Sequence, residues 1–102
     1  MQIIKSADES GRRLKITGAL DINTVAELHT ALSELFSHPS NLSLDLSEIE
    51  TCDAAGLQLL QSAEKTAETS ARRLEFVGVP AAVRDTASAL GLRIGDSHAE
   101  QA

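Results

Sequence analysis

The sequence predicts an α/β domain with a mixed sheet of four to five strands and helices packed mainly on one face. Two observations carry this prediction. The first 20 residues contain a short apolar segment and an alternating segment separated by turn-forming residues, which is typical of a β-hairpin. After that, helical and strand-like spacing alternate along the chain, so the expected order is β-β-α-β-α-β-α. Such an alternation implies parallel strands joined by right-handed crossovers, with the connecting helices together on one side.

The hairpin is predicted from its apolar residues and its turn. Ile3 and Ile4 begin a short apolar segment, and residues 12–17 alternate between apolar and polar side chains. Ser10 and Gly11 form the expected turn between them. The segment Gly18–Asp21 is expected to end the second strand.

The first helix is predicted from a capping box and an apolar ladder. Thr24 and Glu27 have the spacing at which each side chain satisfies a backbone N–H of the other residue. The helix is expected to end before Pro39, because the residue that precedes a proline avoids helical geometry. The ladder consists of Val25, Leu28, Leu32 and Leu35.

The segment 42–67 contains the central strand and the central helix. Leu42, Leu44 and Leu46 alternate with polar residues and predict a half-buried strand, followed by a short polar turn. Asp53 is expected to be the N-cap of the helix, where its carboxylate accepts from first-turn N–H groups and lies at the positive end of the helix dipole. The helix face expected to be buried consists of Leu57, Leu60, Ala63 and Ala67.

The rest of the chain predicts one more strand and one more helix. Residues 73–77 form the strand, Pro80 lies in the first turn of the helix, and Gly91 is its expected C-cap. Leu92 and Ile94 fit either a last short strand or a loop. We expect one domain over residues 1–96 and a frayed tail over residues 97–102. The inner stripe of the last helix is predicted to be Val83, Ala87 and Leu90.

Composition excludes several classes of partner. The net charge is −6 and no basic run occurs, which argues against binding to nucleic acid or to an anionic membrane surface. No apolar segment approaches the ~20 residues of a membrane span, and the N-terminus has no signal-peptide pattern. We therefore expect a cytoplasmic protein without direct membrane insertion.

No residue pattern indicates catalysis, a metal or a cofactor. The three histidines are scattered, and Cys52 has no second cysteine and no base at a suggestive spacing. A buried thiol at the corner between strand and helix is the favoured interpretation of Cys52. No phosphate-binding glycine motif occurs. An enzyme is not expected, and neither is a catalytic residue.

Three small residues follow Asp53 at the predicted helix start. Ala54, Ala55 and Gly56 would leave the backbone donors of the first turn open to whatever approaches. They could equally be small because the helix start packs against the sheet. The spacing alone does not decide between these two interpretations.

Three motifs together resemble those of the STAS domains, which are the anti-sigma factor antagonists and the related domains of sulfate transporters. These motifs are G-x-L-D at Gly18–Asp21, D-L-S at Asp45–Ser47, and D-x-x-G-L at Asp53–Leu57. The likeness covers nearly the whole chain. It implies the STAS fold and a role as a switchable protein-binding module. The partner-binding residues that it implies are Asp21, Asp53, Ala54, Ala55, Gly56 and Leu57.

In the phosphorylated members of that family, the residue straight after the aspartate carries the hydroxyl that a partner kinase phosphorylates. The equivalent residue here is Ala54, so this position cannot accept phosphate. The resemblance therefore implies a chain fixed in the state equivalent to unphosphorylated. Ser47 and Thr51 are nearby alternative acceptors, although structural roles in a turn and at a strand end are favoured for both.

The resemblance implies several partners. The leading hypothesis is an antagonist-like module that binds a GHKL-type kinase, either an anti-sigma factor or a chemotaxis kinase. The alternative is the STAS subunit of an ABC transporter that maintains phospholipid asymmetry of the outer membrane. A small-ligand or nucleotide-binding STAS domain ranks lower. A homodimer that pairs through the first strand is a further expectation.

Overall fold

The computed structural model describes residues 1–9, 11–38, 41–92 and 94. The tail expected over residues 97–102, which includes His98, lies outside these described residues. Within them the chain forms four strands and three helices in the predicted order. The elements are β1 (Gln2–Asp8), β2 (Gly11–Leu20), α1 (Val25–Phe36), β3 (Leu42–Cys52), α2 (Ala54–Thr69), β4 (Leu74–Val77) and α3 (Ala81–Ala89).

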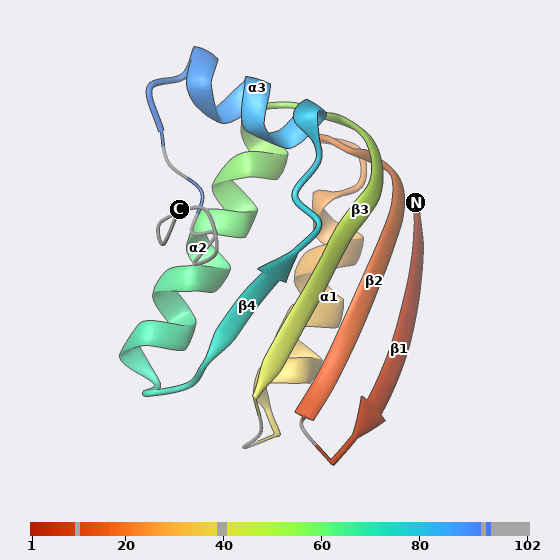
Figure 1. The fold of residues 1–102 in the computed structure, drawn as a ribbon, viewed down its shortest axis with the longest axis vertical. Coiled ribbons are helices and arrows are strands. Elements are labelled where there is room, and N and C mark those ends of the chain that lie inside the picture. Colours follow the sequence, from red (N-terminus) through yellow and green to blue (C-terminus); the bar gives the residue numbers. More distant parts are fainter. Residues whose placement is uncertain (10, 39–40, 93, 95–102) are drawn as a thin grey trace.

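The four strands form one mixed sheet in the order β1-β2-β3-β4 (Figure 1). β1 and β2 are antiparallel, as the hairpin prediction required, and Asp8 pairs with Gly11 next to the turn. β2, β3 and β4 are parallel neighbours. The predicted mixed sheet is therefore confirmed. Leu92 and Ile94 lie outside the four strands, so the loop alternative is correct for them.

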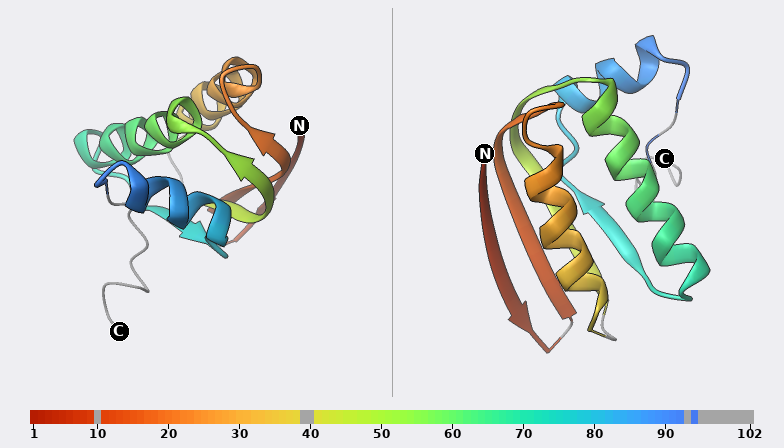
Figure 2. Two further views of the ribbon diagram at one scale, coloured as in Figure 1. Left: turned by 90° about the horizontal axis from the view of Figure 1, so that it is seen from above. Right: turned by 180° about the vertical axis from the view of Figure 1, so that it is seen from behind.

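The helices α1 and α2 lie side by side on one face of the sheet, while α3 crosses the end at which β3 and β4 finish (Figure 2). The core lies between the sheet and α1 and α2, and the predicted inner residues Val83 and Ala87 of α3 are buried in it as well. It is aliphatic apart from Phe76, because the chain has only two phenylalanines and no other aromatic residue. The predicted inner faces of α1 and α2 are confirmed: Leu28, Leu32, Leu35, Leu57, Leu60, Ala63 and Ala67 are buried.

β3 is longer than the sequence predicted. The polar turn expected after Leu46 is a continuation of the strand to Cys52. Two register shifts against β2 accommodate it, between Lys15 and Thr17 and between Gly18 and Ala19. Each shift gives β3 one residue more than β2, as in a β-bulge, and a bulge interrupts the alternation of side chains. The interruption at Ser47 and Glu48, which are both exposed, resembles a turn in the sequence.

Two details of the helix predictions are wrong. Thr24 is the N-cap of α1, but its hydroxyl caps no N–H of the helix. It accepts instead from the N–H of Asp21 (3.0 Å) and lies 2.9 Å from the carbonyl oxygen of Ala19, to which it donates. Leu90 is 46% exposed, because α3 ends at Ala89 and the chain turns away through Gly91, whose φ of 67° is left-handed.

Acidic residues lie at one end of the sheet, and charges of both signs lie at the other. Asp21, Glu50 and Asp53 lie at or next to the ends of β2 and β3. Four of the nine Lys and Arg residues lie at the opposite end, where β2 and β4 begin. These four residues are Arg12, Arg13, Arg72 and Arg73, and they lie with Asp8, Glu9 and Glu75.

Candidate functional site

The carboxylate of Asp53 joins the start of α2 to the loop that follows β2. One oxygen, Oδ1, accepts from the N–H of Gly56 at 3.0 Å, which confirms the predicted N-cap. The other oxygen, Oδ2, accepts from the N–H of Ile22 at 3.1 Å. The backbone N–H of Asp53 also donates to the carbonyl of Leu20. Asp53 therefore fixes the relative position of two segments that are 31 residues apart in sequence.

Asp21 orders the loop between β2 and α1. Its side-chain Oδ1 accepts from the N–H of Asn23 at 2.9 Å, which closes an Asx turn. Its carbonyl accepts from the N–H groups of Thr24 and Val25. With the Asp53 bond to Ile22, these contacts hold the loop in one conformation beside the start of α2.

Gly56 lies where the start of α2 approaches β2 most closely. A Cβ atom on Gly56 would lie 2.5 Å from the carbonyl oxygen of Leu20 and 2.7 Å from its Cγ. No side chain fits without a shift of backbone. Gly56 and Leu57 are both buried, so these two residues support the surface from below.

The surface above Gly56 is small and apolar. Ala54 is exposed, Ala55 is half-buried, and Ile22 on the neighbouring loop is 67% exposed. The N–H groups of Ala54 and Ala55 have no hydrogen-bond partner among the described residues, as is usual in the first turn of a helix. We call Asp21, Ile22, Asp53, Ala54 and Ala55 the helix-start surface.

Sequence reasoning missed Ile22. It follows Asp21 in a segment that reads as a polar turn, and a large apolar side chain in such a turn is the one signal that could have identified it. A single exposed isoleucine is ordinary on a protein surface. Its significance comes from its position beside the exposed Ala54 and the half-buried Ala55, which the local sequence does not reveal.

Cys52 and Thr86 lie behind the helix-start surface. The hydroxyl of Thr86 on α3 donates to the carbonyl of Cys52 (2.7 Å) or of Ala82 (2.9 Å), and ties α3 to the end of β3. Burial, together with the nearby Asp53 carboxylate, raises the pKa of Cys52 to about 11. The residue is half-buried, and its thiol is protonated at neutral pH.

The two alternative phosphoacceptors lie at different distances from the surface. Thr51 is exposed near the end of β3, paired with Ala19 and two residues before Asp53. Ser47 is exposed further back on the strand, roughly 20 Å from Asp53 at the usual rise of a strand. Its hydroxyl donates to Oδ1 of Asp45 at 2.6 Å, so phosphate there would lie against a carboxylate.

No group of three or more metal-ligating side chains is found among the residues that the structure describes. Within the same part of the chain, no helix is long and apolar enough to span a membrane.

Comparison with known proteins gives a family match over most of the chain. A family model described as "Mlab, STAS domain" matches residues 4–94. No sequence among the curated proteins matches the chain significantly.

Solved structures agree with this family match. An anti-sigma factor antagonist from Mycobacterium paratuberculosis is 20% identical with a TM-score of 0.75, over 88% of this chain and 77% of that one. The unphosphorylated anti-sigma factor antagonist SpoIIAA is 17% identical with a TM-score of 0.71, over 89% of this chain and 82% of that one. A chain described as "Mglu" is 16% identical with a TM-score of 0.65 over 72% of this chain, which spans only 18% of that larger protein. At these identities the likeness establishes the fold.

Proposed function

Because the chain belongs to the STAS domain family, we propose that it is a non-enzymatic, antagonist-like regulatory module that binds a cytoplasmic ATP-binding partner through the helix-start surface. The partner would be a GHKL-type kinase, either an anti-sigma factor or a chemotaxis kinase. The observation that carries the proposal is the exposed, apolar first turn of α2 at Ala54 beside the 67% exposed Ile22.

The construction of this surface supports binding without rearrangement. Both carboxylate oxygens of Asp53 already accept backbone N–H groups, and Asp21 closes its own turn. A surface that is ordered before contact loses little conformational entropy on binding. The free N–H groups of Ala54 and Ala55 would add directional hydrogen bonds to an acceptor on the partner.

Regulation at the usual position of the family is not available to this chain. Ala54 occupies the position of the acceptor hydroxyl, and its methyl group cannot be phosphorylated. The surface would therefore stay competent for binding, and control would act on the partner, on the amount of protein, or on Thr51. Of the two alternative acceptors, Thr51 is favoured, because the Ser47 hydroxyl is already bonded to Asp45.

The test is to place a charge where the family places phosphate. We expect Ala54→Asp to weaken partner binding at least tenfold, because a carboxylate would be desolvated in an apolar interface. The fold should persist, since an acidic residue in the first turn of a helix interacts favourably with its dipole. Affinity capture from the native cell followed by mass spectrometry would identify the partner, and titration with it would give the affinity.

Ala81→Asp is the matched control. Ala81 is also an exposed alanine at the first position of a helix, but it belongs to α3. Capture of an ATP-binding kinase by the wild type and by Ala81→Asp, with loss in Ala54→Asp, would support the proposal. If a folded Ala54→Asp protein captured the partner as well as the wild type does, the start of α2 would not be part of the interface.

A second candidate is the STAS subunit of an ABC transporter for phospholipid. A binding surface that cannot be switched at Ala54 suits a permanent subunit of an ATPase assembly as well as a regulator. Capture of an ABC ATPase with its permease would favour this candidate. The homodimer expected through the first strand also stays a prediction, for which β1 offers an edge of the sheet.

A further inference from the structure

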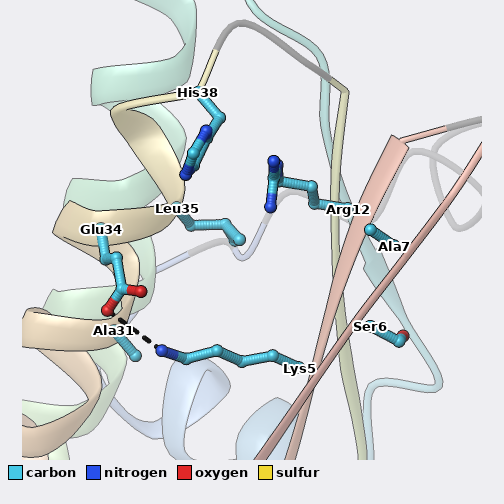
Figure 3. Close-up of a pocket in the computed structure, with 8 residues that line it drawn as sticks. All are labelled: Lys5, Ser6, Ala7, Arg12, Ala31, Glu34, Leu35 and His38. Carbon is cyan, nitrogen blue, oxygen red and sulfur yellow. Dashed lines mark hydrogen bonds and ion pairs between the residues drawn. The ribbon is translucent and has the colours of Figure 1, made fainter.

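A pocket of about 270 Å³ lies between β1, the start of β2 and the last turns of α1, at the end of the sheet opposite the helix-start surface (Figure 3). It forms between the edge strand β1 and α1, where the side chains that face each other are small. Ala7 on β1 and Ala31 on α1 both line it. None of its lining residues belongs to the helix-start surface.

Basic side chains dominate the charge of this pocket. Lys5, Arg12 and His38 line it and point into it from β1, β2 and the end of α1 (Figure 3). The ammonium of Lys5 is paired with Glu34 at 3.0 Å. The side chains of Arg12 and His38 form no hydrogen bond or ion pair with any residue that the structure describes.

The formal charge of the lining indicates a single negative charge on the ligand. Arg12 and Lys5 contribute two positive charges and Glu34 removes one, which leaves +1 before His38 is counted. A chain of net charge −6 thus keeps an unpaired guanidinium inside a pocket. A guanidinium fork matches the geometry of a carboxylate in two parallel hydrogen bonds, and the imidazole can donate a third.

The remaining lining is apolar. Leu35 and Ala31 are 6% and 7% exposed and form the α1 side of the pocket. The volume corresponds to about nine water molecules at 30 Å³ each, and lies just below the roughly 300–1,000 Å³ of pockets that hold drug-sized ligands. A short hydrocarbon body fits these dimensions.

We propose that the pocket formed by Lys5, Ala7, Arg12, Ala31, Leu35 and His38 binds a small organic monoanion. The ligand is a carboxylate with an unbranched apolar body of about four to six carbons. Its carboxylate pairs with Arg12 and its hydrocarbon lies on Leu35 and Ala31. This site is separate from partner binding and does not depend on the function proposed above.

The test is a titration of the isotope-labelled protein with hexanoate, followed by amide NMR. We expect saturable shifts centred on Ala7, Arg12, Leu35 and His38. Hexanol, which has the same hydrocarbon without the charge, should bind at least tenfold more weakly, and inorganic phosphate should bind weakly because it lacks the apolar body. Equal binding of hexanol or of phosphate would overturn the proposal.

Two variants and one control variant locate the site. Arg12→Gln should weaken hexanoate binding about tenfold, while Arg13→Gln, with the same charge change on the opposite face of β2, should leave it unchanged. Ala7→Leu should abolish binding by filling the pocket, without any change of charge and at an exposed position of β1. Equal losses in both arginine variants, or wild-type binding by Ala7→Leu, would each contradict the assignment.

Discussion

Cys52 is a residue whose chemistry is set by its surroundings. Burial first, and the nearby Asp53 carboxylate second, raise its pKa from 9.0 to about 11, which reduces the thiolate fraction at pH 8 about a hundredfold. A thiolate of higher pKa is also the stronger nucleophile, which recovers part of the lost rate. We expect iodoacetamide to alkylate the folded protein about ten- to a hundredfold more slowly than the protein unfolded in urea, measured by mass spectrometry. Equal rates in the two states would contradict the burial of the thiol.

The pKa of Asp45 is shifted downward, whereas that of Cys52 is shifted upward. The hydroxyl of Ser47, with its backbone N–H, holds the pKa of Asp45 below its usual value. This contribution to stability is therefore present above the pKa of the unfolded chain and disappears as the pH falls through the pKa of the folded state. We expect Ser47→Ala to raise the pKa of Asp45. An NMR titration that monitors the Asp45 carboxyl carbon measures this change. Ser43→Ala is the control, because the Ser43 hydroxyl has no hydrogen-bond partner in the described structure.

At the scale of elements, the start of α2 depends on the absence of a side chain at residue 56. We expect Gly56→Ala to reduce the free energy of unfolding by about 3 kcal/mol, because the new methyl group would overlap the Leu20 carbonyl. Gly91→Ala should cost about 1 kcal/mol, since its surroundings are open and only the left-handed backbone is strained. Urea denaturation measures both values. Equal costs would show that the close contact with β2 does not limit residue 56.

The helices were predictable because their signals are local. The buried faces of α1 and α2 follow from residue spacing, and Asp53 caps α2 through a bond to a residue three positions away. The full length of β3 was not predictable in the same way. Its bulges arise from pairing with β2, and in the sequence they appear only as the two consecutive polar residues Ser47 and Glu48. The role of Thr24 was also predicted wrongly. Its hydroxyl donates to the carbonyl of Ala19 at the end of β2 and does not cap the helix.

At the scale of the whole molecule, the candidate site was predictable in part. Asp53 and Ala54 could be located from the sequence, since a helix start has a recognisable pattern. Ile22 could not, because its position beside Ala54 depends on a hydrogen bond that spans 31 residues. The pocket between β1 and α1 was also beyond the sequence, since Lys5 and Glu34 come together only when the hairpin and the helix pack.

The acidic residues at the ends of β2 and β3 have a kinetic consequence. Asp21, Glu50 and Asp53 lie at that end of the sheet, whereas the four arginines at the other end lie with Asp8, Glu9 and Glu75. A partner with a positively charged surface would be drawn toward the acidic end before the two surfaces touch. Added salt would screen this attraction and slow the association.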